Sequence, residues 1–390
     1  MKILFWQWHS FMNRGIETAF QKLNVEYDIL FYQQTDWEKN DGIVETLEQK
    51  LATQAYDLVF SVNFAPLVAE VCKQHGILYV SWVYDAPLHI RNLEALKYDT
   101  NRIFFFDSIQ TQEYQKQGIH AFHMPLAADL QFAEGLTERV WEKGADIAMV
   151  GQLYQTEYKN YTAILPERVR GYLDGLLNAQ MKVSGGYFLG ELIDLPLLEQ
   201  CNEAFQKASD GTFQIGKREL EYMMACEMTG RERYLALALL SKYFKVELYS
   251  GDRDERLPQV QQMGYVNYYH GMAEVFAGSR INLNISLKII PSGVPLRIFD
   301  ILGAGGFVLT NLQPELYELF TPDKDLVIYE GLEDLYEKAA FYIAHDAERK
   351  KSRNRDIGQQ QKGIRLCSVS GKCCVCVQSK EQSTCGRLKS

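Results

Sequence analysis

The 390-residue chain has the composition of an ordinary globular protein, with 47% hydrophobic residues, 23% charged residues and a formal net charge of −9. Its length allows two domains of usual size, each with its own core. No apolar run approaches the roughly 18 uncharged residues that a membrane-spanning helix needs, and residues 1–5 enter a β-rich run instead of a cleavable signal. We therefore expect a cytoplasmic protein without a transmembrane segment.

The charge is distributed unevenly along the chain. Residues 1–348 contain 30 Lys and Arg against 48 Asp and Glu, whereas residues 349–390 contain 11 against 2. An acidic body repels polyanions, so nucleic acid is not an expected partner of the folded part. Cysteines are also rare in the body and crowded in the last 24 residues, and their rarity in the body is consistent with a reducing compartment.

Strands and helices alternate through the first part of the chain. β-rich runs are separated by stretches with helical spacing of apolar residues, which predicts a doubly wound parallel sheet over residues 1–135. The ligand crevice of such a sheet lies beyond the carboxyl ends of its strands. The expected strands are Lys2–Trp8, Tyr27–Phe31, Asp57–Val62, Leu78–Val83 and Arg102–Asp107. The expected helices are Gly15–Leu23, Ile43–Thr53, Pro66–Gln74 and Ile109–Gln117.

Polar side chains follow two of these strands. His9 comes after the first strand, and Asp85 and His89 come after the fourth. A carboxylate or an imidazole in such a position can accept the proton of a reacting hydroxyl group. The alternative is structural: Asp85 caps the turn before Pro87, and the two histidines are loop residues.

Residues 136–345 repeat the α/β pattern with one interruption. Asp146–Tyr154 is typical of a strand that runs into a glycine loop at Gly151. Residues 158–243 have helical apolar spacing, which predicts a helical insertion before the α/β pattern resumes at Phe244–Tyr249. The later expected strands are Val266–Tyr269, Phe307–Thr310 and Leu326–Tyr329, and the later expected helices are Met272–Ala277, Pro314–Phe320 and Leu332–Ala344.

The most informative stretch begins with the expected strand Ile281–Leu287. A Gly/Pro loop follows it, then the expected helix Leu296–Leu302 and a glycine turn, an arrangement that can hold a phosphate at the helix N-terminus. Arg297 and Asp300 are three residues apart and share one face of this helix. A guanidinium suits a diphosphate, and a carboxylate suits a sugar diol. The alternative is a solvated ion pair of little consequence.

The segment SGVPLRIFDILGAGGFVLTNLQPEL, with INLNISL before it, resembles the nucleotide-binding half of group 1 glycosyltransferases, in particular the bacterial CgeB-like branch of spore maturation proteins. The resemblance implies a GT-B fold, in which two Rossmann-like domains face each other across a cleft. It implies transfer of a sugar from a nucleoside diphosphate sugar to a glycan, protein or small-molecule acceptor. The W-x-x-D-x-P stretch is similar to the family's N-terminal half, so Asp85 and His89 are candidates for acceptor binding or proton transfer.

Many relatives carry two glutamates separated by seven residues, and the matching positions here are Ser292 and Asp300. Asp300 can still accept hydrogen bonds from ribose, whereas the Ser292 hydroxyl supplies no second negative charge. Arg297, Lys288 and loop amides would stabilise the leaving diphosphate, so we expect no cofactor and no obligatory metal. The resemblance implies the donor-binding residues Gly151, Lys288, Ser292, Gly293, Arg297, Asp300, Gly305, Asn311 and Glu315.

The last residues, 346–390, change in composition. No Phe, Trp or Tyr occurs after Arg349, so this basic tail cannot bury much apolar surface, and we expect it to be disordered or to result from a reading-frame change. A zinc site at Cys367, Cys373, Cys376 and Cys385 is the alternative, but the spacing lacks a second C-x-x-C pair.

Two other functions stay open at this point. The GT-B architecture also serves nucleotide-sugar epimerases, which form product without an acceptor. The chain is alternatively a non-catalytic surface protein that binds a sugar or a nucleotide, a reading that Ser292 and the tail favour.

Overall fold

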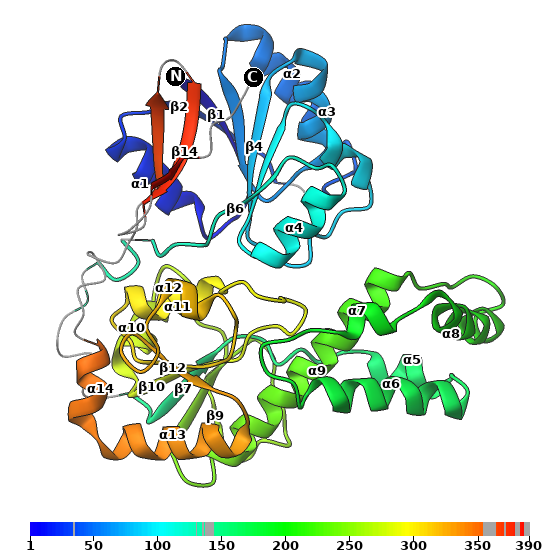
Figure 1. Ribbon diagram of the computed structural model, residues 1–390, viewed down its shortest axis with the longest axis vertical. Helices are drawn as coiled ribbons and strands as arrows, with labels where there is room; N and C mark the ends of the chain where they lie inside the picture. Colours follow the sequence, from blue (N-terminus) through cyan, green and yellow to red (C-terminus); the bar gives the residue numbers. More distant parts are fainter. Residues whose placement is uncertain are drawn as a thin grey trace. The chain divides into compact units, whose positions relative to one another are not determined.

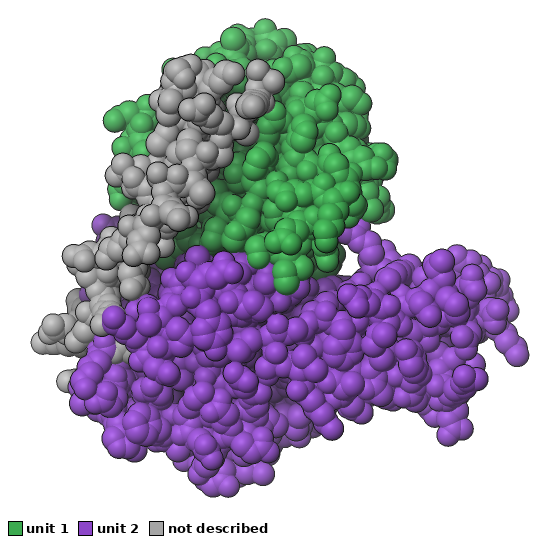
Figure 2. Space-filling view, viewed as in Figure 1, with its two compact units in different colours: residues 1–131, 355–390 green, residues 132–354 purple. Residues whose placement is uncertain are grey.

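The computed structural model describes residues 1–33, 36–129, 131–134, 136 and 144–353, and the backbone of three strands between residues 364 and 385. The chain forms two compact units (Figure 2), residues 1–131 with 355–390 and residues 132–354. The sequence placed this division a few residues later, between residues 135 and 136. Among the helices of the described ranges, none combines the length and apolar character that crossing a bilayer requires.

The first unit is built on a six-stranded sheet in which every pairing is parallel (Figure 1). The strand order is β2-β1-β3-β4-β5-β6. Both β1 and β4 are buried along nearly their whole length, because helices cover both faces of the sheet. The strands are β1 (Lys2–Gln7), β2 (Glu26–Phe31), β3 (Leu58–Val62), β4 (Leu78–Val83), β5 (Asn101–Phe105) and β6 (Ala121–His123). The helices are α1 (Asn13–Lys22), α2 (Ile43–Thr53), α3 (Pro66–His75) and α4 (Ser108–Lys116), with a 3-10 helix at Leu93–Lys97.

The alternation of side chains along β1 explains the two layers. Leu4 and Trp6 belong to the core cluster that α2 and α3 cover. Phe5 points to the other face, where its ring lies 5.8 Å from that of Phe20 on α1. Successive residues of a strand face opposite sides, so one apolar run supplies two cores.

The second unit has a similar parallel sheet in the order β12-β11-β10-β7-β8-β9. The chain runs outward from β7 to β9 on one side and then from β10 to β12 on the other. The order therefore reverses between β7 and β10, and such a reversal is where α/β sheets bind ligands. The strands are β7 (Ile147–Val150), β8 (Val246–Tyr249), β9 (Gln261–Gln262), β10 (Ile281–Asn284), β11 (Val308–Asn311) and β12 (Val327–Tyr329). The sheet helices are α10 (Met272–Gly278), α11 (Leu296–Gly303), α12 (Leu316–Leu319) and α13 (Leu332–Ala344).

A helical insertion separates β7 from β8 and extends to one side of the sheet (Figure 1). Its helices pack around their own core, which includes Leu173, Phe205 and Met224. The longest helix, α9, joins this core to the sheet, because Leu237 and Leu240 near its end belong to the core under β7 and β10. The helices are α5 (Tyr158–Ala163), α6 (Glu167–Gln180), α7 (Leu189–Leu192), α8 (Leu195–Ala208) and α9 (Lys217–Leu240).

The structure confirms the α/β class and corrects the prediction at several elements. Val266–Tyr269 is not a strand: it carries only an isolated bridge between Asn267 and Gly271, and the ladder of β8 is instead continued by β9. Gly264, at φ +82°, turns the backbone out of the sheet before the expected strand begins. The sequence also missed β6 and the 3-10 helix, both of which are too short to show a period.

The tail begins with helix α14 (Asp346–Arg353), contrary to the expectation of disorder from residue 346. Arg349 is buried there and donates a hydrogen bond of 2.7 Å to the carbonyl oxygen of Tyr342 on α13. Beyond it the structure describes only the backbone of an antiparallel set of strands, β13 (Ile364–Val369), β14 (Lys372–Gln378) and β15 (Ser383–Cys385). The cysteine side chains considered for zinc lie outside the described residues, so the prediction for this part of the tail stays untested.

Candidate functional site

The reversal of strand order between β7 and β10 brings two loops together at the carboxyl edge of the second sheet. Gly151 follows β7 with a φ of +155°, a value that a residue with a side chain rarely adopts. A Cβ at this position would lie 3.2 Å from Nη1 of Arg233. The Gly151 N–H donates to the carbonyl oxygen of Tyr249, at 3.0 Å, within the sheet ladder. Gly151 therefore makes room for a guanidinium, and its own amide is already used.

Arg233 was not predicted from the sequence. It lies on α9, is 9% exposed, and donates hydrogen bonds to the carbonyl oxygens of Gln152 and Ile285, which follow β7 and β10. Its guanidinium carbon lies 4.7 Å from the centre of the Tyr154 ring. Its Nε is buried and has no hydrogen-bond partner among the residues that the structure describes. Arg233 thus places a buried positive charge at the strand-order reversal.

The electrostatic surroundings of Arg233 favour an anion nearby. Burial lowers the pKa of the Arg233 guanidinium and the positive charge of Arg297 also lowers it, whereas Tyr154, Tyr329 and Glu232 raise it. Burial raises the pKa of the Tyr154 phenol, while the charges of Arg233 and Arg297 lower it. The two guanidinium groups therefore act on the same small region. A negatively charged ligand there would offset both the burial of Arg233 and the repulsion between the two charges.

Arg297 lies where the sequence predicts it, on the first turn of α11. Its guanidinium contacts Sδ of Met272 and lies 5.5 Å from the ring centre of Phe276, both on α10. Its Nη1 lies 3.8 Å from Oδ2 of Asp300, and the Arg297 side chain stays 27% exposed. The apolar contacts hold the stem and leave part of the fork accessible.

Asp300 is 1% exposed and accepts a hydrogen bond of 2.9 Å from the Tyr268 hydroxyl. We expected this carboxylate to meet a sugar diol. In the structure Asp300 contacts Tyr268 and Arg297, so its carboxylate can position the guanidinium of Arg297.

Lys288, which the resemblance implies as a donor-binding residue, has a carboxylate partner in the structure. Its Nζ forms an ion pair of 2.9 Å with Glu232, and both side chains are largely buried. Burial raises the pKa of the Glu232 carboxyl and the Lys288 charge lowers it, as in a mutually stabilised pair. The positive charge of Lys288 is therefore balanced within the protein. Arg233 thus joins the two cations that the sequence named, and both Lys288 and Arg297 have a carboxylate beside them.

The loops after β10 and β11 are linked by buried hydrogen bonds. The Ser292 hydroxyl donates to Oε1 of Glu315 at 2.8 Å, and the Glu315 N–H donates to the Ser292 carbonyl oxygen at 3.1 Å. Oδ1 of Asn311 accepts from the Ser286 N–H at 2.8 Å. Gly293 is buried beside Ser292. A carboxylate thus lies next to Ser292 after all, supplied by Glu315 from the neighbouring loop.

Gly305 does not belong to this group. Its φ is +69° and its N–H donates to the Leu302 carbonyl oxygen at 2.9 Å, while Gly306 donates to Ile301 at 2.8 Å. These bonds end α11 at its C-terminus. Because α11 runs back across a parallel sheet, its C-terminus lies at the amino edge of the strands, opposite Gly151 and Asn311. The Gly305 turn is a helix cap, and the prediction that it binds the donor is not supported by its position.

In the first unit, the structure brings Asp85 and His89 together. Asn63, with a φ of +60°, donates from Nδ2 to Oδ2 of Asp85 at 2.5 Å and accepts from the Tyr84 N–H at 3.0 Å. Burial raises the pKa of the Asp85 carboxyl, while the Asn63 hydrogen bond and the His89 charge lower it. His9 lies on an exposed part of the loop, where its ring is 5.0 Å from that of Phe31. Asp85 is therefore a carboxylate with a raised proton affinity at a strand end.

Comparison with known protein families gives one match. Residues 231–363 match a family model described as glycosyl transferase-like, a segment that includes Arg233, Lys288, Arg297 and Glu315. No significant match was found among curated proteins.

Solved structures share the architecture over nearly the whole chain. A glycosyltransferase from Rickettsia africae superposes with a TM-score of 0.51 at 10% identity, covering 90% of this chain and 91% of its own. HepE from Anabaena in complex with UDP gives 0.50 at 11% identity, with 93% and 95% covered. The fold is that of GT-B glycosyltransferases, and with the family match it confirms the prediction of a glycosyltransferase.

Proposed function

We propose that the chain transfers a sugar from a nucleoside diphosphate sugar to an acceptor, as CgeB-like glycosyltransferases do. The observation that carries the proposal is the buried guanidinium of Arg233, which links the carboxyl ends of β7 and β10 and shares its surroundings with Arg297. Two fixed positive charges at the strand-order reversal suit a diphosphate. The complexes of HepE with UDP and with UDP-glucose make a uridine donor the first to test.

The chemistry follows from the charge that develops as the sugar leaves. Breaking the glycosidic bond transfers negative charge to the diphosphate, and preorganised cations stabilise that charge more in the transition state than in the ground state. The partly exposed fork of Arg297 would bind phosphate oxygens directly, and Arg233 would act through its field. With two guanidinium groups in place, we propose that the reaction has no obligatory metal.

The loops after β10 and β11 would hold the rest of the donor. Glu315 lies against Ser292, at the position where many relatives carry the first of their two glutamates. We propose that Glu315 supplies the negative charge that Ser292 lacks, near the transferred sugar. Ser292, Gly293 and Asn311 then shape the loop around it.

We assign proton removal from the acceptor hydroxyl to Asp85. Its raised pKa makes its carboxylate a better base than an exposed aspartate, and His89 tunes that pKa. We propose that the protein acts in the cytoplasm, where thiols stay reduced. Its buried cysteines Cys72, Cys201 and Cys226 carry free thiols, which supports this proposal.

The test is a donor screen that measures released nucleoside diphosphate with and without candidate acceptors. Arg297→Ala should lower the turnover of the best donor by about 10²- to 10³-fold, because one charge-stabilising group is removed, while circular dichroism stays unchanged. Arg280→Ala is the matched control: Arg280 pairs with Asp146 at 3.4 Å, at the opposite edge of the same sheet. Unchanged turnover in Arg297→Ala would remove this residue from the reaction.

The same screen separates the alternative functions. An epimerase would form product from the donor without any acceptor, and it would transfer no sugar. A non-catalytic binding protein would bind the nucleotide in calorimetry without turnover of any donor.

A further inference from the structure

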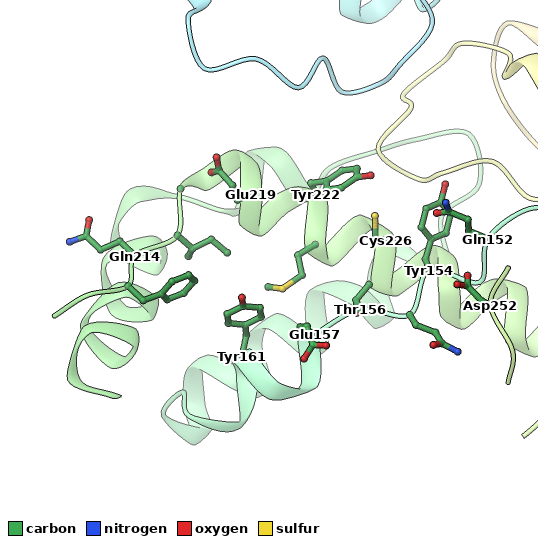
Figure 3. A pocket seen from close by; sticks show the side chains of 15 residues that line it. Gln152, Tyr154, Thr156, Glu157, Tyr161, Gln214, Glu219, Tyr222, Cys226 and Asp252 are labelled. Carbon is green, nitrogen blue, oxygen red and sulfur yellow. The ribbon is translucent and has the colours of Figure 1, made fainter. Parts of the chain in front are cut away.

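The helical insertion contains a cavity of about 710 Å³ (Figure 3), inside the roughly 300–1,000 Å³ typical of small-molecule sites. Its walls come from the loop after β7, from α5, from residues 213–216 and from the first half of α9. None of the catalytic or donor-binding residues named in the sequence analysis lines it. The cavity therefore calls for a separate account.

Aromatic side chains form the apolar wall of the cavity. The rings of Tyr161 and Phe213 are stacked, with centres 5.5 Å apart and planes at 18° to each other. Tyr222 and Met223 line it from α9, and all four side chains are half-buried. Rings held in this way expose flat apolar surface whose conformational entropy is already lost.

The rim of the cavity is polar and carries negative charge. Gln214 and Glu219 are exposed at one end, and Glu157 is exposed beside the loop after β7 (Figure 3). None of the described residues that line the cavity is Lys or Arg. Carboxylates and amides both accept hydrogen bonds from hydroxyl groups. A carboxylate repels an anionic ligand, and a neutral amide cannot balance its charge. Stacking surface with hydroxyl acceptors and no cation is suited to a neutral carbohydrate.

The cavity adjoins the surroundings of Arg233 through two of its lining residues. Gln152 and Tyr154 line its inner end, and these residues also contact Arg233, by a hydrogen bond from the guanidinium to the Gln152 carbonyl oxygen and by the 4.7 Å stacking contact. A chain of sugars in the cavity would thus extend from the region of the two guanidinium groups along α9.

We propose that this cavity binds a neutral oligosaccharide portion of the acceptor, an inference that rests on the glycosyltransferase function proposed above. The acceptor of this enzyme is then a glycan, and the helical insertion selects it. The first experiment applies the full chain to an array of neutral and uronic-acid-containing oligosaccharides and then titrates the best neutral binder by calorimetry. We expect binding of neutral glycans in preference to acidic ones.

Variants locate the binding. Tyr161→Ala should weaken the titrated affinity about tenfold, since it removes one stacking surface. Tyr172→Ala is the control, because Tyr172 is an exposed tyrosine of the same insertion, on α6, and does not line the cavity. Should Tyr161→Ala fold poorly, Gln214→Ala and Glu219→Gln change only exposed rim groups and should each weaken binding severalfold.

The outcomes are distinct from those that test the donor site. UDP affinity, measured on the same samples, should stay unchanged in all these variants. Loss of the proposed function would appear as a wild-type chain that turns over no nucleotide sugar. The inference on the cavity is overturned if the array shows no neutral ligand or a preference for acidic glycans, or if the rim and wall variants bind as the wild type does.

Discussion

Removing the charge of Arg233 tests the central electrostatic argument. In Arg233→Met the helix keeps an unbranched side chain of similar length, but the hydrogen bonds to the carbonyl oxygens of Gln152 and Ile285 are lost. Hydrogen bonds that involve a charged group contribute roughly 1.5–3 kcal/mol each. The gross loss is about 3–6 kcal/mol, and relief from burying the guanidinium offsets part of it. We expect a net destabilisation of about 2–4 kcal/mol, measured by urea unfolding.

The effect on the ligand is separate. At an effective dielectric constant of about 20, two unit charges about 8 Å apart interact by about 2 kcal/mol, so for a phosphate bound at that distance UDP should bind about 30-fold more weakly to Arg233→Met. Calorimetry at a temperature where the variant is fully folded measures this. Arg233→Lys keeps the charge and loses part of the hydrogen bonding to the Gln152 and Ile285 carbonyl oxygens. Its UDP affinity should therefore lie between that of Arg233→Met and that of the wild type.

Arg231→Met is the matched control for this experiment. Arg231 lies two residues away on α9, and its side chain, 29% exposed, pairs with the largely buried Glu227 at 2.9 Å. Its removal leaves the Glu227 carboxylate without this partner, so Arg231→Met should lower the free energy of unfolding by about 1–3 kcal/mol and leave UDP affinity unchanged. If Arg233→Met were destabilised and yet bound UDP with wild-type affinity, Arg233 would be a structural residue only, and the donor site would have to be placed elsewhere.

Four further substitutions probe the site and its support. Asp85→Asn should lower the rate of transfer by roughly 10²- to 10⁴-fold and abolish the acidic limb of the pH–rate profile. In the wild type this limb rises as the pH passes the Asp85 pKa, which lies above the usual 3.8. His89→Gln should move the limb to higher pH, because the positive charge of His89 lowers the Asp85 pKa, and an unmoved limb would refute the assignment. Ser292→Ala removes the 2.8 Å hydrogen bond to the buried Glu315 carboxylate and should lower the free energy of unfolding, measured in urea, by about 1–3 kcal/mol. A loss of donor turnover larger than the loss of folded protein would support the role proposed for Glu315, and a loss no larger than that of folded protein would contradict it. Gly306→Ala would place a Cβ 2.8 Å from the Phe276 carbonyl oxygen, which should lower the free energy of unfolding by about 1–3 kcal/mol and the melting temperature by several degrees. Gly251→Ala is the control, because a Cβ there has no atom within 4 Å, and it should be nearly neutral. Equal melting temperatures of the two variants would contradict the packing argument.

The regular elements were well predicted where a period was long enough to read. The ranges Ile43–Thr53, Leu78–Val83 and Leu332–Ala344 have the expected bounds in the structure. Short elements were less predictable: Val266–Tyr269 is not a strand, because β propensity over four residues cannot overcome the turn at Gly264.

The candidate site was predicted in part. Arg297 and Asp300 were recognised because they lie three residues apart on one helix, a local relation. Arg233 was missed, although it lies on the buried face of α9 between Thr229 and Leu237, and an arginine among buried positions is a signal that sequence reasoning could have used. The ion pair of Lys288 with Glu232 was not predicted, because the two residues are distant in the sequence.

The sequence alone determined the α/β alternation, the helical insertion and the resemblance to glycosyltransferases, since these depend on periods and motifs within a few tens of residues. Only the tertiary structure decided which charges meet. Packing α9 against the ends of β7 and β10 puts Arg233 beside Gly151, pairs Lys288 with Glu232, and leaves Gly305 at the opposite edge of the sheet. The physical reason is that burial and Coulomb energy depend on distances in space, and these are fixed by how whole helices pack on the sheet.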